Sequence, residues 1–293
     1  GQIVTPKVAA SFEANITSNT YEDGVGAITF DRNLTTIGEK AFYNCRTLQS
    51  ITIPQSVKTL SSSAFEGCIA IESFAGAFAT SDGNALVVDN ALYTYAPSGD
   101  EEYVIADSIT TIMDKAFAHC SNLKKLTIPA TVTTIGKDSF LKCGKGELIV
   151  NCDISTKNSF GGMTFSKLTI SDKVTVIGPC CFASCRSLES VKLPSGLTEI
   201  GYNAFEYCVS LKDVTLPATL TKLGSEAFGG CKSLTSIVIP DGVTVVNGFG
   251  GCTALEKVVL PNNCNAIGSR AFSNTAIANI EIPNSVTDIG SYA

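Results

Sequence analysis

Cysteine and histidine are the residue types of this chain that most readily do chemistry, and the sequence contains twelve cysteines but one histidine, His119. Cysteines can form disulfides, hold a metal ion or remain buried thiols. Most of them recur in one register, with an interval of 23 residues from Cys45 to Cys68 and again from Cys208 to Cys231. The eight members of this row are Cys45, Cys68, Cys120, Cys143, Cys185, Cys208, Cys231 and Cys252. Side chains that repeat in this way point in parallel, so we expect free buried thiols, with disulfides between neighbouring units as the alternative.

The remaining patterns do not assemble a catalytic or metal-binding site. Cys180, Cys181 and Cys185 resemble a metal cluster, but Cys181 takes the place of a recurring alanine and Cys185 belongs to the row. His119 precedes Cys120, yet adjacency along the chain does not aim an imidazole at a thiol. The motifs G-x-S-x-G, H-E-x-x-H and the phosphate-binding loop do not occur in the sequence. We therefore predict no catalytic residue, no cofactor and no bound metal, and a protein that is not an enzyme.

The cysteine row belongs to a repeated unit of about 23 residues. Its clearest copy, Leu34 to Pro54, reads LTTIGEKAFYNCRTLQSITIP. The segment L-x-x-I-x-I-P alternates apolar and polar residues, which predicts a half-buried strand, and the proline ends that strand because it has no N–H to pair. The segment V-x-x-I-G predicts a second short extended piece, and A-F-x-x-C predicts a tight helical turn.

A single unit is too small to bury its own apolar side chains, so neighbouring units must stack and share one core. We predict a right-handed solenoid that is mostly β, with short helical or 3-10 turns and a parallel sheet on its concave face. The glycine after the isoleucine is replaced by Ser61 and Met113 in two units, which indicates close packing rather than a left-handed backbone. Nine phenylalanines should form one column in the core: Phe42, Phe65, Phe117, Phe140, Phe182, Phe205, Phe228, Phe249 and Phe272.

Both ends of the chain depart from the repeat. We assign residues 1–26 to an N-terminal cap, with Phe12 and Ile16 as plugs of the open core, and residues 27–293 to the solenoid. The chain begins at Gly1 rather than Met and stops within a repeat, so we expect a mature chain without its leader and further repeats after Ala293.

The pattern also breaks inside the solenoid. An insertion at about 76–105 carries turn signals, and its segments 85–88 and 91–95 should form a β-hairpin closed at Asp89-Asn90. Residues from about 144 to 170 read as a degenerate repeat whose strand is 147–151. In the last full unit one residue is lost and Asn274 is expected to take the cysteine's place, which indicates a hydrogen-bonding role for the row.

The repeated unit resembles that of a known repeat family. The unit IGEKAFYNCRTLQSITIP, repeated over nearly all of residues 27–293, resembles the BspA-like leucine-rich repeats, because period, Ala-Phe pair, cysteine and strand-ending proline agree together. The resemblance implies a leucine-rich-repeat solenoid of a secreted or surface protein of host-associated bacteria, often Bacteroides-type, or of some protozoa. It also implies adhesion to host matrix proteins, as described for some members, and it offers no catalytic residues.

Two groups of residues are candidates for ligand binding. The insertion carries Tyr93, Tyr95 and Tyr103, and tyrosine is favoured in binding hot spots; the alternative is that these rings cover the hairpin's own small core. Outward strand positions carry Lys125, Lys167 and Lys192, which could form a basic strip for an anionic ligand; the alternative is a solvated β-face.

Composition limits the partners. A formal charge of −6 and a pI near 4.9 are the wrong sign for nucleic acid, and no apolar stretch is long enough to span a bilayer. We expect a non-catalytic monomer, extracellular or on the cell surface, that adheres to a host extracellular protein or glycan. The alternative is a structural spacer on the cell surface.

Overall fold

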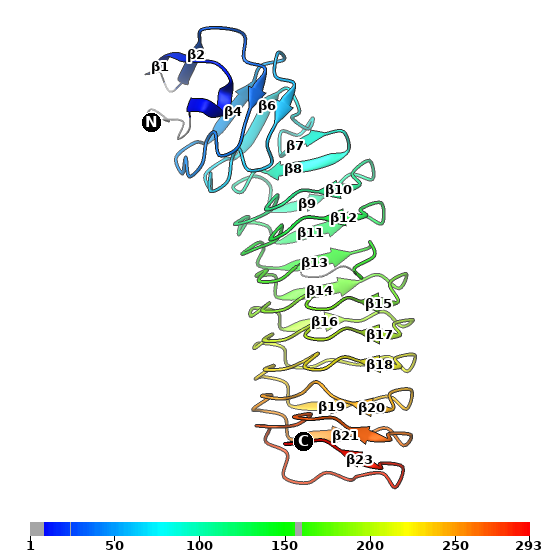
Figure 1. The fold of residues 1–293 in the computed structure, drawn as a ribbon. Helices are drawn as coiled ribbons and strands as arrows, with labels where there is room; N and C mark the ends of the chain where they lie inside the picture. Colours follow the sequence, from blue (N-terminus) through cyan, green and yellow to red (C-terminus); the bar gives the residue numbers. More distant parts are fainter. Residues whose placement is uncertain (1–8, 24, 156–159) are drawn as a thin grey trace. The chain divides into compact units, whose positions relative to one another are not determined.

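The computed structural model describes residues 9–23, 25–155 and 160–293, and these form a parallel β-solenoid of about 11 turns (Figure 1). The one helix among them is a 3-10 helix, η1, at Ala9–Phe12. No helix of the described residues has the length and apolar composition needed to cross a bilayer.

The described residues divide into two compact units between which the chain alternates. Unit 1 contains the residues up to Glu101 together with Ser108–Asn122 and Thr134–Cys143. Unit 2 contains Glu102–Asp107, Leu123–Thr133 and Gly144–Ala293.

Unit 1 is built from four sheets. An antiparallel hairpin joins β1 (Ile16–Glu22) to β2 (Val25–Phe30), and two parallel pairs join β3 (Thr36–Ile37) to β5 (Thr59–Leu60) and β4 (Ser50–Ile53) to β6 (Ser73–Gly76). The fourth sheet has the order β12 (Thr134–Ile135), β10 (Thr111–Ile112), β8 (Ala91–Tyr95) and β7 (Ala85–Val88).

Unit 2 continues both kinds of strand as parallel ladders. Its longest sheet has the order β16 (Ser190–Lys192), β14 (Lys167–Ile170), β13 (Glu147–Val150), β11 (Lys125–Ile128) and β9 (Glu102–Val104). The shorter sheets are β15 (Val176–Ile177), β17 (Glu199–Ile200) and β18 (Lys222–Leu223); β19 (Ser236–Val238) and β21 (Lys257–Val259); and β20 (Val245–Val246), β22 (Ala266–Ile267) and β23 (Asp288–Ile289). The parallel stacking is confirmed, and so is the strand predicted at 147–151. The segments before Pro217 and Pro283 do not form the strands that the repeat predicts, and the first of them makes only an isolated bridge from Asp213 to Ser190.

The A-F-x-x-C segment is not the helical turn that the sequence suggests. In the coil of Phe42, the residues Lys40 and Asn44 both have left-handed backbone, with φ of 54° and 56°. The N–H of Cys45 donates to the carbonyl of Phe42 at 3.1 Å, which closes a turn of four residues. The segment is thus a tight β-turn that has left-handed Asn44 at its third position and left-handed Lys40 two residues before it. The same pair of left-handed positions recurs along the chain with ordinary side chains, such as Lys115 and His119.

Aromatic rings stack through the core as predicted, and two further rings join the column. Neighbouring rings in unit 2 have centroids 5.1 to 5.8 Å apart. Phe160 continues the column in the degenerate repeat, where it stacks on Phe182, and Tyr95 stacks on Phe117 in the coil of the insertion. The column therefore runs through coils in which the sequence pattern is broken.

The insertion is a coil of the solenoid. β7 and β8 form the predicted antiparallel hairpin, with left-handed Asp89 and Asn90 at its turn. β8 also pairs in parallel with β10, so it occupies the place of a V-x-x-I strand and carries β7 on its free edge.

Phe12 and Ile16, the residues predicted to plug the open core, pack against the first coil, while residues 1–8 of the predicted cap lie outside the described residues. Phe12 is 1% exposed, and its ring lies 5.6 Å from that of Phe42, while Ile16 is partly buried against the same core. The β1–β2 hairpin continues to Phe30, past the boundary predicted at residue 26.

The recurring glycine is required by close approach of neighbouring coils. A Cβ on Gly201 would lie 2.6 Å from the backbone nitrogen of Pro179, whereas a Cβ on Gly196 would meet nothing nearer than 3.9 Å. We predict that Gly201→Ala lowers the free energy of unfolding by about 1–3 kcal/mol through overpacking. Gly196→Ala, the matched control, changes it little. Urea denaturation measures both, and an equal loss in the two variants would contradict the packing explanation.

Candidate functional site

The cysteine row is a structural hydrogen-bonding element of the core. None of the twelve cysteines, all of which lie in the described residues, forms a disulfide, and all except Cys180 are buried. In unit 2 the Sγ of Cys208 donates to the carbonyl of Phe182 in the preceding coil at 3.4 Å, and Cys231 and Cys252 repeat the contact at 3.3 and 3.1 Å. The row therefore links coils through thiol-to-carbonyl hydrogen bonds, and the hydrogen-bonding role predicted for it is confirmed.

Asn274 does not take the place of a row cysteine, contrary to the sequence prediction. It lies two residues after Phe272 and has left-handed backbone, with φ of 55°, as Asn44 has in the first coil. Thr275 stands in the cysteine's position, and its hydroxyl donates to the carbonyl of Phe272 at 2.8 Å. No residue is lost in this unit, because Phe272 and Thr275 keep the spacing of Phe42 and Cys45.

The remaining candidate groups for chemistry are not assembled into a site. His119 is exposed and the neighbouring Cys120 is fully buried, so they do not form a nucleophile–base pair. Burial raises the pKa of Cys181 and Cys208 well above the ordinary thiol value, which keeps both protonated and unreactive. The described residues contain no group of three or more histidine, cysteine or carboxylate side chains that could hold a metal ion.

The three lysines of the predicted basic strip lie exposed on the long sheet of unit 2, but acidic side chains interrupt them. The register places Lys125 between Glu102 and Glu147, and Glu147 between Lys125 and Lys167. Lys167 Nζ lies 3.1 Å from Glu147 Oε1. Lys192 belongs to the next row of outward residues, in register with Thr169. The sheet therefore presents alternating charges, and the sequence could not show this because the pairing brings together residues about 20 positions apart.

The three tyrosines of the insertion do not gather on one surface. Tyr95 is 1% exposed, and its hydroxyl donates to the carbonyl of Asp100 at 3.0 Å. Tyr93 is half-buried and packs on the core of unit 1, whereas Tyr103 lies half-buried in β9 of unit 2, in register with Leu126. For Tyr95 the structure supports the alternative that the ring is part of the hydrophobic core.

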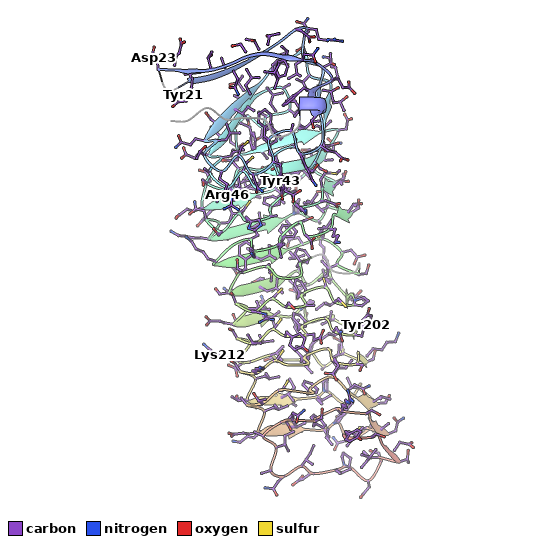
Figure 2. The ribbon with its side chains drawn as sticks, turned by 60° about the vertical axis from the view of Figure 1, so that its left-hand side comes forward. Tyr21, Asp23, Tyr43, Arg46, Tyr202 and Lys212 are labelled. Atoms are coloured by element: carbon purple, nitrogen blue, oxygen red, sulfur yellow. The ribbon has the colours of Figure 1, made fainter. Side chains whose placement is uncertain are left out.

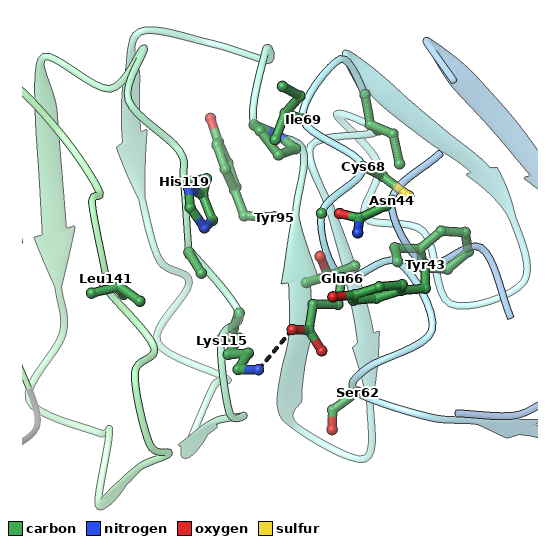
Figure 3. Close-up of a pocket in the computed structure, with 17 residues that line it drawn as sticks. Tyr43, Asn44, Ser62, Glu66, Cys68, Ile69, Tyr95, Lys115, His119 and Leu141 are labelled. Atoms are coloured by element: carbon green, nitrogen blue, oxygen red, sulfur yellow. Dashed lines mark hydrogen bonds and ion pairs between the residues drawn. The ribbon is translucent and has the colours of Figure 1, made fainter. Parts of the chain in front are cut away.

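A cavity of about 190 Å³ lies in unit 1, where the coil of the insertion has no A-F-x-x-C turn (Figure 3). Tyr95 N–H still donates to the next coil, at the carbonyl of Ala116, but the residues after Tyr95 do not form the regular turn. Ala96 N–H donates to the carbonyl of Asn84, within the insertion. Glu66 from the coil before the gap and Lys115 from the coil after it form an ion pair of 2.7 Å across one end. The cavity is lined by Tyr43, Asn44, Ser62, Ile69, Thr94 and His119, among others.

Several cations and one carboxylate act on His119, which lines the cavity. The pKa of His119 is lowered by its partial removal from water and then by the charges of Lys142 and Arg46, while Glu66 opposes the shift. The hydrogen bond from Lys115 to Glu66 raises the pKa of Lys115. Lys40 Nζ lies 5.6 Å from the centroid of the Tyr43 ring, which lines the cavity. Sequence reasoning missed this site, although the interval of 52 residues between Cys68 and Cys120 was its signal.

Comparison with known proteins gives a family and a fold. The family model described as BspA type leucine rich repeat region matches in six copies, at residues 15–81, 91–156, 153–248 and 245–293. The structure is similar to a leucine-rich repeat protein of Bacteroides ovatus, with a TM-score of 0.57 and 23% identity over 94% of this chain and 82% of that chain. It also matches a leucine rich cell surface protein of Faecalibacterium prausnitzii, with a TM-score of 0.44 and 21% identity over 95% and 87% of the two chains. None of the curated proteins compared with the sequence matches it.

The buried row predicts a defined pattern of thiol reactivity. In the native protein Cys180 reacts first with a thiol reagent, because it is the one cysteine that is not buried. After denaturation without a reductant, all twelve thiols react. Mass spectrometry of alkylated peptides measures both patterns. Fewer than twelve reactive thiols would mean that disulfides or a metal hold the missing ones.

His119 is predicted to titrate below 6.5, its ordinary value. Lys142→Asn removes one of the cations responsible and should raise the pKa of His119, and asparagine tolerates the left-handed backbone at that position. Because the folded chain binds this proton less readily than the unfolded chain, the free energy of unfolding should fall as pH decreases through about 6.5. NMR titration of the imidazole measures the shift. Lys58→Asn, a control elsewhere in unit 1, leaves the pKa unchanged, and an equal rise in both variants would contradict this assignment.

Proposed function

Because the chain belongs to the BspA-type leucine-rich repeat family, we propose that it is a non-catalytic binding protein of the bacterial cell surface. Its partner is a host extracellular protein or glycan, which it contacts as a monomer through the surface of the solenoid. Solenoids of this family are repeat scaffolds for protein binding, and the partner class follows from the family resemblance.

The long sheet of unit 2 is the observation that carries the proposal. Its inward positions stay apolar and buried, as with Leu126, Leu148 and Leu168. The outward residues beside them change from rung to rung between acidic, basic and small polar side chains. Since each rung is held by its inward side chains and backbone, the outward side chains are free to match a partner without changing the fold.

The chemistry of this face indicates a polar interface. Lys125, Lys167 and Lys192 supply its candidate contacts, and Val104, in register with Thr127, is 69% exposed on the same face. Tyr103 is in register with the inward-facing Leu126, so it does not belong to this face. Figure 2 shows Lys212 projecting from the side of unit 2 opposite to Tyr202. Exposed ion pairs contribute little to the free energy of unfolding. The charges of this face can therefore determine binding specificity and the rate of association without affecting the fold.

A structural spacer is the second candidate function. The observation that favours it is the small, polar character of many outward positions, such as Ser190 and Ser236, because hot spots of protein binding are enriched in tryptophan and arginine.

The test is a binding screen of the whole chain against arrays of host matrix proteins and glycans. The adhesin proposal predicts saturable binding by at least one class, and Lys167→Glu should weaken it about tenfold, equivalent to ~1.4 kcal/mol. Lys222→Glu is the matched control, because Lys222 is also exposed and ion-paired, with Glu199 at 3.2 Å, but lies in the other kind of strand. A screen without any binding would support the spacer, and equal losses in both variants would remove the sheet face from the proposal.

A further inference from the structure

The cavity of unit 1 lies where the hydrogen-bonding pattern between coils is broken. In regular turns, the N–H of the phenylalanine and the N–H of the residue two positions later both donate to carbonyls of the next coil, and in several turns the N–H two positions before the phenylalanine does so as well. Phe42 N–H donates to the carbonyl of Ala64, and Asn44 N–H donates to that of Glu66, both at 2.8 Å. The same pair of bonds recurs in the turns that begin at Phe117, Phe160, Phe182, Phe205, Phe228 and Phe249.

In the coil before the cavity the corresponding two donors are the N–H groups of Phe65 and Gly67. Among the described residues, nothing accepts a hydrogen bond from the N–H of Phe65 or from that of Gly67. Both residues line the cavity. The N–H two positions before the phenylalanine is that of Ser63, and it donates to the hydroxyl of Ser61 at 3.3 Å.

The far wall offers the complementary group. In the regular pattern the carbonyl of the residue after phenylalanine accepts an N–H from the preceding coil, as Leu141 accepts from His119 at 2.9 Å. At the cavity the corresponding carbonyl is that of Ala118, and the preceding coil has Pro97 at the donor position, which has no N–H. Within the described residues, Ala118 O receives only a long contact from the Cys120 thiol at 4.0 Å.

The coil of the insertion therefore lacks one turn, while the neighbouring coils keep the backbone groups that would bond to that turn. Two donors face the cavity from one wall and one acceptor faces it from the other, in the arrangement that a turn of backbone satisfies in other coils. We propose that this cavity binds a short acidic peptide segment of a protein partner, whose backbone takes the place of the missing turn. The inference rests on the proposed binding function, because it names the chemistry of a partner.

A peptide fits this arrangement better than a simple anion. Phe65 and Gly67 are two residues apart, and the equivalent donors elsewhere meet two different carbonyls that are also two residues apart. A carboxylate has both oxygens on one carbon, and it has no N–H for Ala118. The volume of about 190 Å³ corresponds to about six water molecules, which leaves room for a short stretch of backbone with small side chains.

The preference for an acidic segment follows from the charges at the cavity. Lys142 and Arg46 do not line the cavity, but both are exposed and their charges act on His119, which does line it. Lys115 is engaged with Glu66, so the positive potential of Arg46 and Lys142 is left for a ligand. Apolar surface is provided by Tyr43, Ile69 and Leu141, of which Ile69 is 44% exposed.

The experiment is an NMR titration of the full ¹⁵N-labelled chain with acetyl-Gly-Glu-Gly-Gly-amide. The amide resonances of Phe65 and Gly67 should shift together and saturate, and their hydrogen exchange should slow, because both N–H groups gain acceptors. The analogue with Gln in place of Glu should bind several-fold more weakly at low ionic strength. Sodium acetate, the simple-anion probe, should not shift both amides.

The matched variants are Arg46→Gln and Lys232→Gln, since both positions directly follow a row cysteine. Arg46→Gln should weaken the acidic peptide several-fold, and Lys232→Gln should not. The inference is overturned if neither amide shifts at high peptide excess, if acetate reproduces the shifts, or if the two variants weaken binding equally. If the peptide does not bind but the array shows a partner, the cavity inference fails and the proposed function stands. If the array shows no binding, the proposed function fails even when the peptide binds.

Discussion

The hydrogen bonds that join each coil to the next are the constraint on which the rest of this structure depends. A coil of about 23 residues cannot bury its own apolar side chains, so it is stable only when the neighbouring coils accept and donate its backbone groups. The strands meet this requirement through parallel ladders, and the turns meet it through the paired N–H groups that begin at each phenylalanine. The cysteine thiols add a third link, from one turn to the phenylalanine carbonyl of the previous coil.

This constraint separates the residues that hold the fold from those available to a partner. Positions that face the core or approach the next coil carry mostly aromatic, aliphatic, thiol or glycine residues, as Phe205, Cys208 and Gly201 illustrate. Outward strand positions carry no such restriction, and in unit 2 they form alternating rows of charge. A binding scaffold benefits from this separation, because its surface can change while the stacking remains.

The insertion is a coil that meets this constraint only in part. Its β8 strand continues the ladder and its Tyr95 continues the ring column, so the core of unit 1 is preserved. Its turn is missing, however, and the neighbouring coils keep the donors and the acceptor that the turn would have used. The cavity is thus a consequence of the same hydrogen-bonding rule that builds the regular coils.

The sequence by itself determined the period, the strands and their prolines, the hairpin at Asp89-Asn90 and the aromatic column, because each depends on side-chain spacing within one unit or on repetition between units. It also indicated that the cysteines are hydrogen-bonded thiols. The tertiary structure alone decided which residues become neighbours across coils: the glutamates between the lysines of unit 2, Tyr95 in the core, and the unpaired N–H groups at Phe65 and Gly67. These outcomes depend on the register of pairing between distant segments and on the path of an irregular coil, and neither is encoded in the spacing of residues within a single repeat.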